Sequence, residues 1–362
     1  MNNTYDVIII WSWAAWLFSA IQAPFWYKKL LLEKTNKLGQ KVLLSGWERA
    51  NVSNIDIEAT RDYFGQNKKA MIWILSKFNQ RDIMTFFSEN GVNIIEEDRW
   101  RLILESWDSR ELLDLLVRKA KKNNCEIKLN SEVVSIENIE WNFIIKLKNW
   151  KQYQAKKVVV ASWWKSFYQV WTEWDWFNFA DDLWIKYSKL HKWLVWLTTK
   201  QDLKELSWIS CDLKIELLDN KNKLIYQEKW PLLFTHFWIS WPIVFNLVVA
   251  LWELLWNNEE KYNDLIIKLS FDLEKTPKRI IKFFNLNDDN KNIELTINEL
   301  RSWKEAKVTV GWILLDELTN NLESKKYSWL YFCWEILDLT GKTWWFNLQQ
   351  AWSTGYIVGN SL

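Results

Sequence analysis

The sequence predicts an α/β fold: a domain with a parallel central sheet, interrupted by an inserted domain with a β part and a helical part. Three observations predict it. The chain opens on a buried-type apolar strand followed by a turn and a helix. A second apolar strand follows at βαβ spacing and ends in an acidic residue. The middle of the 362 residues then changes to shorter alternating strands before a strand and a helix close the chain.

The opening elements follow from their apolar patterns. Tyr5 to Ile10 is a continuous apolar run, typical of a strand buried on both faces of a parallel sheet. An alanine-containing helix is predicted from Ala14. Leu30 to Leu32 forms the second strand, and Glu33 lies at its tip, where the acidic residue of a dinucleotide-binding βαβ unit meets a ribose hydroxyl.

The segment KLGQKVLLSGWERANVSNID reads as a polar loop of the kind that carries function. Helical stretches are predicted up to about Asn90, and an amphipathic helix from Asp108 to Asn123. The alternation and apolar runs that follow predict four strands, at Glu126 to Leu129, Glu132 to Ile136, Phe143 to Leu147 and Lys157 to Ala161.

The domain boundaries are predicted at the changes of pattern: residues 1–165 and 308–362 form the sheet domain, and residues 166–307 form the inserted domain. Alternating strands are expected there at Asp212 to Leu218 and Lys223 to Gln227, followed by helices rich in Lys, Asn and Ile. A helix is also expected near Pro242. The closing segment has a strand at Leu330 to Cys333 and a helix from about Asn347.

Tryptophan is unusually frequent and glycine unusually rare: the chain has 31 Trp and 8 Gly, whereas ordinary chains carry roughly 7% glycine. Trp11, Trp13 and Trp16 occupy the three glycine positions of a Rossmann-like G-x-G-x-x-G turn. That turn needs glycine for the bend, for the approach of a pyrophosphate and for helix packing. We therefore hypothesise that most of these tryptophans are glycines in the living protein, written as Trp because UGA codons were read with the wrong code.

Charge and cysteine content exclude several classes. A formal charge of +2 gives no electrostatic case for a nucleic-acid or anionic-membrane partner. Cys125, Cys211 and Cys333 have no C-x-x-C spacing, which disfavours a disulfide scaffold, a zinc site or a redox dithiol and favours buried reduced thiols. No metal site is predicted. The apolar run from Val7 to Trp26 lacks a preceding basic segment and contains polar breaks, so we expect a soluble, cytoplasmic protein rather than a signal anchor.

With tryptophan read as glycine, the chain resembles the bile-acid reductase and aminoacetone oxidase family, FAD-dependent oxidoreductases with a glutathione reductase-like fold. The resemblance covers nearly the whole chain. It rests on six blocks in the family's order: IIIWSWAAWLFSA, LLEKTNKLGQKVLLSGWERANVSN, EDRWR, VVVASWWKSF, PLLFTHFWISWP and LYFCWEILDLTGKTWWFNLQQAWSTG. It implies a Rossmann-like FAD-binding domain and a flavin that carries out the redox step.

The resemblance also implies a set of cofactor contacts. Glu33 would accept hydrogen bonds from the ribose, Arg49 would lie near phosphate or flavin, and Glu335 would face the ribityl chain. The full set is Trp11, Trp13, Ala14, Ala15, Trp16, Glu33, Lys34, Lys41, Ser45, Gly46, Arg49, Asn51, Val134, Ser162, Trp163, Trp334, Glu335, Asp338, Trp344, Trp345, Phe346 and Asn347.

The chain departs from the family pattern in three places. It has Glu48 to Asn51 where relatives often have Gly-Arg-Cys-Asn, so no cysteine serves that loop. Its middle region is somewhat short for the family, which leaves the substrate pocket undefined. Trp352 lies where relatives often carry an aromatic residue, so we keep it as a true tryptophan.

His236, in LFTHF, is the candidate general acid or base, because imidazole titrates near neutral pH; a hydrogen-bonded structural role is its alternative. His191, in the polar SKLHK stretch, is expected to be solvated. No second glycine-type strand-turn-helix unit lies between Ser166 and Lys307. A separate nicotinamide domain is therefore not predicted, and NAD(P)H is expected at most as a transient reductant.

The sequence thus predicts an FAD-dependent oxidoreductase that acts on a small molecule, with no nucleic-acid or membrane partner. Substrate identity and oligomeric state stay open. One alternative is an FAD-dependent tRNA-modifying enzyme. Another, if the tryptophans are real, is a Trp-rich non-catalytic binding protein or a relative that has lost FAD affinity.

Overall fold

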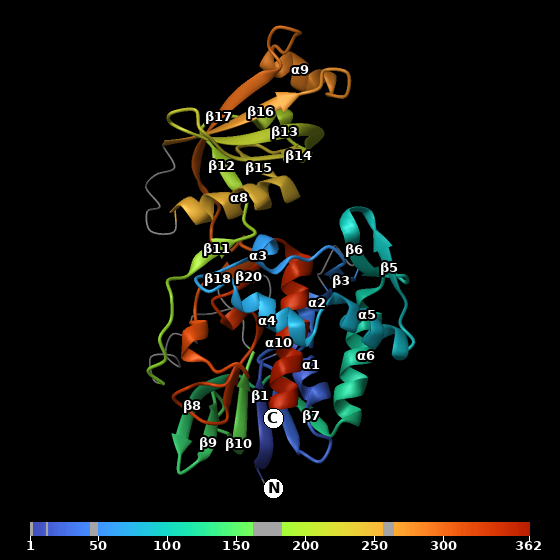
Figure 1. The fold of residues 1–362 in the computed structure, drawn as a ribbon, viewed down its shortest axis with the longest axis vertical. Helices are drawn as coiled ribbons and strands as arrows, with labels where there is room; N and C mark the ends of the chain where they lie inside the picture. Colours follow the sequence, from blue (N-terminus) through green and yellow to red (C-terminus); the bar gives the residue numbers. More distant parts are fainter. Residues whose placement is uncertain (1–2, 12–13, 44–49, 162–182, 256–263) are drawn as a thin grey trace. The chain divides into compact units, whose positions relative to one another are not determined.

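The computed structural model describes residues 3–11, 14–43, 50–161, 183–255 and 264–362. Contacts divide the chain into two compact units. The first comprises residues 1–191 and 309–362, and the second comprises residues 192–308 (Figure 1). The sequence-predicted boundary near residue 166 lies outside the described residues.

A seven-stranded sheet forms the core of the first unit. Its order is β7-β2-β1-β10-β9-β8, and β19 also pairs with β10. Parallel pairing joins β7, β2, β1, β10 and β19, whereas β9 pairs antiparallel with both β10 and β8. The predicted α/β class with a parallel sheet centre is therefore confirmed. The strands are β1 (Thr4–Ile10), β2 (Lys29–Leu32), β7 (Cys125–Lys128), β8 (Val133–Ile139), β9 (Asn142–Leu147), β10 (Gln152–Val160) and β19 (Leu330–Phe332).

Two helices pack closely beside this sheet. Helix α1 (Ala14–Gln22) and helix α10 (Trp344–Ser361) lie side by side in Figure 1. The approach is so close that a Cβ added to Gly355 would lie 2.3 Å from the carbonyl oxygen of Ala15. Helix α6 (Ser109–Lys122) begins at Asp108, whose carboxylate accepts a hydrogen bond from the backbone N–H of Arg110.

Smaller elements complete the first unit. A three-stranded sheet has the order β3-β6-β5, and β20 pairs with β4. The strands are β3 (Asn51–Asn54), β4 (Tyr63–Phe64), β5 (Ile94–Glu97), β6 (Arg101–Leu104) and β20 (Thr340–Gly341). The helices are α2 (Gln40–Leu43), α3 (Ala59–Asp62), α4 (Ala70–Lys77) and α5 (Gln80–Glu89). Strands β11 (His191–Trp193) and β18 (Val308–Val310) form a separate two-stranded sheet.

The second unit is a closed barrel with its own apolar core. Its strand order is β12-β15-β14-β13-β16-β17. The strands are β12 (Leu197–Thr199), β13 (Ile209–Asp219), β14 (Leu224–Phe234), β15 (Trp238–Ser240), β16 (Leu265–Phe271) and β17 (Asn292–Leu300). Two helices accompany them, α8 (Pro242–Leu255), which packs against β14, and α9 (Lys278–Phe284).

One local expectation holds only in part and another is wrong. Helices rich in Lys, Asn and Ile were expected late in the inserted domain, and Lys278–Phe284 does form helix α9, but Leu265–Phe271 forms a strand whose buried and half-buried residues alternate. Its period of two, rather than its composition, determines the structure. His191 was expected to be solvated, but it lies buried in β11, because its strand packs into the protein.

Two further findings concern the cysteines and the apolar helices. Cys125, Cys211 and Cys333 are all buried, as the sequence predicts. Burial raises the pKa of the Cys125 thiol to about 12, which leaves it protonated near neutral pH. Within the ranges that the structure describes, no helix is both long and apolar enough to cross a bilayer.

Candidate functional site

The carboxyl ends of four parallel strands meet at one edge of the large sheet. Backbone hydrogen bonds continue there from strand to loop. Trp11 N–H donates to the Leu32 oxygen at 2.9 Å, and Cys333 N–H donates to the Val160 oxygen at 3.2 Å. In open α/β sheets this edge is where ligands bind. The sheet therefore gathers residues from three distant parts of the sequence at one candidate site.

The turn between β1 and α1 begins with a buried indole side chain, that of Trp11. Trp11 has a left-handed backbone with φ of 72° and is buried, and the Lys34 ammonium lies 5.2 Å from its ring. Trp16 is fully buried in α1, and its indole N–H finds no hydrogen-bond acceptor among the described atoms. A buried unpaired donor carries a desolvation cost. Trp11 therefore has a backbone conformation typical of glycine, and Trp16 carries a large side chain whose buried N–H adds a cost in free energy.

Glu33 lies at the tip of β2, as the sequence predicts. Its carboxylate accepts hydrogen bonds from the Thr35 N–H at 2.7 Å and the Thr35 hydroxyl at 2.8 Å. Burial raises the pKa of Glu33 to about 7, while those hydrogen bonds and Lys34 oppose the rise. Lys34 forms a 3.0 Å ion pair with Glu132. The strand end thus presents a buried carboxyl that a ribose hydroxyl could approach.

The segment after β19 brings two buried acids to the same sheet edge. Glu335 accepts a hydrogen bond from the Thr309 N–H at 2.9 Å. Burial raises the pKa of Asp338 to about 6, against the lowering effect of the Gln66 N–H and the Ser188 hydroxyl. The backbone carbonyl oxygen of Asp338 leaves no room for a side chain at residue 65, because a Cβ on Gly65 would lie 2.2 Å from it.

The first turn of α10 holds the last predicted contacts. Asn347 uses its amide locally: it accepts from the Gly341 N–H and donates to the Gly341 and Thr343 carbonyls, all at 2.9 to 3.0 Å. The Asn347 side chain therefore fixes the start of the helix. Trp345 lies beside Arg101, whose guanidinium is 5.9 Å from its ring. The indole N–H of Trp345 is buried with no acceptor in the part of the chain that is described.

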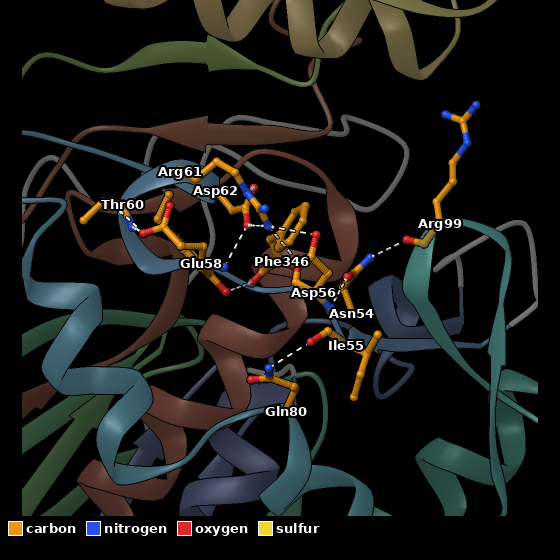
Figure 2. Close-up of polar contacts among 11 residues, drawn as sticks. Asn54, Ile55, Asp56, Glu58, Thr60, Arg61, Asp62, Gln80, Arg99 and Phe346 are labelled. Atoms are coloured by element: carbon orange, nitrogen blue, oxygen red, sulfur yellow. Dashed lines mark hydrogen bonds and ion pairs between the residues drawn. The ribbon is translucent and has the colours of Figure 1, made fainter.

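A polar cluster that sequence reasoning missed braces this helix start (Figure 2). Arg61 donates to both carboxylate oxygens of the buried Asp62, at 2.9 and 2.6 Å, and forms a 3.2 Å ion pair with Asp56. The next residue, Tyr63, donates its hydroxyl to the Phe346 carbonyl at 3.0 Å. Asp62 raises the pKa of Arg61. The only signal in the sequence is the close spacing of opposite charges in DIEATRD.

The other predicted contacts are placed unevenly. Ala14 and Ala15 are buried at the start of α1, Asn51 is buried in β3, and Val134 is largely exposed in β8. Lys41 belongs to α2. Six predicted contacts lie outside the described residues, namely Trp13, Ser45, Gly46, Arg49, Ser162 and Trp163.

His236 lies in the turn between β14 and β15 of the barrel, where its side chain is exposed. The His236 carbonyl accepts a hydrogen bond from the Leu203 N–H at 2.9 Å. Its imidazole stacks with Trp238 at 6.2 Å. The ring is open to solvent, and its catalytic role stays a prediction.

Comparison with known proteins assigns this architecture to a family. The family model described as the HI0933-like protein Rossmann domain matches residues 5–361. The chain belongs to the HI0933-like family. A solved 3-ketosteroid-delta4-(5alpha)-dehydrogenase from Rhodococcus jostii RHA1 shares its fold. The TM-score is 0.57 at 10% identity, covering 99% of this chain and 96% of that one.

Two curated relatives of this HI0933-like chain match almost end to end. One, named ribosomal RNA dihydrouridine synthase, is from Escherichia coli; it is 25% identical and covers 99% of this chain and 98% of its own length. The other, named 3-dehydro-bile acid delta(4,6)-reductase, is from Clostridium scindens. It is 21% identical and covers 91% of both chains. The predicted resemblance to a bile-acid reductase is thus found, but the relationship is distant.

The residues as written do not fit an FAD. Glu33 suits a ribose, but the indole of Trp11 occupies the turn where a pyrophosphate has to approach the backbone. Trp334, also buried with a left-handed φ of 68°, stands just after β19 at the same edge. The indole side chains of the printed sequence therefore occupy the position at which the fold would bind a cofactor.

Proposed function

We propose that this HI0933-like protein, in its functional form, is an FAD-dependent oxidoreductase that transfers hydride or electrons between a small organic substrate and flavin. One observation carries the proposal: the family match over residues 5–361 coincides with a sheet edge that gathers Glu33, Glu335 and the start of α10. The flavin supplies the redox chemistry, and the protein binds and orients it. We propose that the protein acts in the cytoplasm.

We propose further that the substrate carries a carbon–carbon double bond conjugated to a carbonyl group. The names of the two curated relatives support this class. Dihydrouridine is uridine with the double bond next to its C4 carbonyl reduced, and a 3-dehydro bile acid places its delta(4,6) double bonds next to a ketone. Both products arise by adding hydride and a proton across a polarised double bond.

A second candidate substrate is a uracil base within RNA. It is supported by the relative named ribosomal RNA dihydrouridine synthase, which covers 99% of this chain. The near-balanced charge of +2 argues for the small molecule, because RNA binders normally present a basic face. A simple binding measurement distinguishes the two candidates: the RNA substrate predicts that the protein retains RNA in a salt-sensitive way, and the small-molecule substrate predicts that it does not.

The test is a stopped-flow assay of the flavin-loaded protein. NADH and NADPH are each mixed with it, and bleaching of the flavin identifies the electron donor. The reduced protein is then mixed with an enone steroid or with a uridine-containing RNA fragment. Reoxidation by the enone alone supports the first candidate, and reoxidation by the RNA alone supports the second. Reoxidation by neither contradicts the proposed substrate class.

His236 is proposed as the proton donor or acceptor in this reaction. His236→Gln is expected to lower turnover by roughly 100-fold and to change the pH–rate profile. His191→Gln serves as the control for a general loss of histidine. Unchanged turnover and an unchanged pH profile in His236→Gln would dismiss the assignment.

A further inference from the structure

Among the residues that the structure describes, tryptophans account for more than half of the non-glycine residues with a left-handed backbone. Within the described ranges, eleven tryptophans have φ between +50° and +126°. All other non-glycine residue types together contribute nine, and four of those nine are asparagines, the side chain that tolerates this region best. The tryptophans concerned are Trp11, Trp100, Trp107, Trp141, Trp150, Trp184, Trp208, Trp241, Trp312, Trp329 and Trp334.

A bulky side chain at positive φ is a true outlier, because its Cβ crowds the carbonyl oxygen. Glycine has no Cβ and adopts this conformation freely. Gly39, Gly65, Gly91 and Gly311 do so here. The tryptophans at positive φ therefore behave as this chain's glycines behave.

The hairpin between β8 and β9 shows what the backbone requires. Two residues connect the strands, Glu140 at φ of 47° and Trp141 at φ of 71°. Two positive φ values define a type I′ turn, whose second position is ordinarily glycine. Trp141 is 81% exposed and has no core to fill. Packing thus gives no reason for an indole in this turn.

The hairpin between β9 and β10 repeats the pattern. Trp150 has φ of 66° and is 93% exposed. Its N–H donates to the Leu147 carbonyl at 3.0 Å, and the Leu147 N–H donates to the Lys151 carbonyl at 2.9 Å. These bonds close a tight connection whose left-handed residue is ordinarily glycine. Two adjacent hairpins therefore carry tryptophan at their glycine position.

Trp352 differs in every respect. It lies within α10, is fully buried, and donates its indole N–H to the Val52 carbonyl at 2.8 Å. Its ring meets Phe18 and Phe87 edge to face, at 5.6 and 6.0 Å. A tryptophan that is buried, has its N–H hydrogen-bonded and packs its ring against two other aromatic rings fits its position in the fold.

We infer that the structure sorts the tryptophans into two classes: the eleven at positive φ are glycine in the functional polypeptide, and Trp352 is a genuine tryptophan. Decoding of UGA as glycine produces the first class, and a TGG codon produces the second. Trp11 and Trp334 belong to the first class, so the same decoding removes the indoles that conflict with FAD at the sheet edge. The inference stands on backbone geometry and does not depend on the proposed substrate.

The direct test is peptide mass spectrometry of the protein isolated from its native cells, together with the codons of its gene. The result expected is glycine, with TGA codons, at all eleven positions and tryptophan, with TGG, at position 352. The intact mass then falls below the 44.0 kDa of the printed sequence. Tryptophan in the native peptides at these eleven positions, or glycine at position 352, overturns the sorting. Neither outcome depends on how a recombinant variant folds.

A second test uses thermal unfolding of the chain as printed. Trp150→Gly is expected to raise Tm by about 2–4 °C, because it relieves a left-handed tryptophan. Trp26→Gly is the matched control: Trp26 is 76% exposed but is absent from the left-handed set, and its replacement is expected to leave Tm unchanged or lower it. Trp352→Gly is expected to lower Tm. Equal shifts for Trp150→Gly and Trp26→Gly would contradict the role of φ.

Discussion

At the residue scale, the Glu33 carboxyl lies in an environment that differs clearly from water. Burial at the tip of β2 raises its pKa to about 7, from an ordinary value of 4.5. The folded protein therefore holds its proton longer than the unfolded chain does. The contribution of Glu33 to the free energy of unfolding is therefore fully present below about pH 4.5 and is lost as the pH rises toward 7.

We predict that Glu33→Gln removes this dependence. Unfolding free energy of the unsubstituted chain, measured in urea from pH 4.5 to 8, is expected to fall by as much as about 3 kcal/mol relative to the variant. Glu137→Gln, at a half-exposed carboxylate paired with Lys146, is the control and is expected to keep the fall. An unchanged slope in Glu33→Gln would show that the Glu33 carboxyl is not desolvated as described.

The position of Glu33 could be predicted from the sequence, and the reason is local. Glu33 follows an apolar strand at βαβ spacing, and its position at the strand tip needs no long-range information. The cluster of Arg61 and Asp62 could not be predicted, because it acquires its role only when β4 pairs with β20 and brings Tyr63 to Phe346. His191 was misplaced for a similar reason, since its polar neighbours concealed a buried strand.

At the element scale, the pairing of α1 with α10 depends on a close approach of two backbones. A Cβ at Gly355 would meet the Ala15 carbonyl oxygen at 2.3 Å. Backbone atoms cannot move aside as the end of a flexible side chain can, so the helices would have to separate. Helix α1 carries the turn at the candidate cofactor position, and its separation would disturb that turn.

We predict that Gly355→Ala destabilises the protein by about 1–3 kcal/mol in urea unfolding. Asn360→Ala, an exposed position on the same helix, is expected to change stability by less than about 0.5 kcal/mol. Flavin content of the two variants, each produced with UGA decoded as glycine and measured by absorbance after purification, should fall only in Gly355→Ala. A Gly355→Ala variant as stable as the Asn360→Ala control would mean that the helices are less close than described.

Elements with a strong period were predicted well, and elements judged by composition were not. Helix α6 agrees with the expected span because its apolar stripe and the Asp108 cap are both local signals. The Lys, Asn and Ile composition of the late inserted domain favoured helices there, but the register of β16 along β13 and β17 fixes that segment as a strand. Barrel closure is a long-range property that composition does not report.

At the scale of the whole molecule, the chain has two separate apolar cores, one around the large sheet and one inside the barrel. Each core contains fully buried aliphatic side chains, such as Leu30 in β2 and Ile267 in β16. Two compact units with their own cores are expected to unfold in distinguishable steps.

We predict two transitions in differential scanning calorimetry. Leu30→Ala and Ile267→Ala each create a cavity that costs about 2–5 kcal/mol. Leu30→Ala is expected to lower the transition of the sheet unit, and Ile267→Ala that of the barrel. A single transition that both variants shift equally would contradict the two-unit description.

The central claim is that this HI0933-like protein binds flavin once small residues line the turn after β1. The measurement is the absorption spectrum of the purified chain, produced in one form with UGA decoded as glycine and in another as printed. The account predicts a yellow first form with the two absorption bands of bound flavin, and a colourless second form. A colourless glycine-decoded protein that is folded by circular dichroism, or flavin bands of equal strength in both forms, would contradict it.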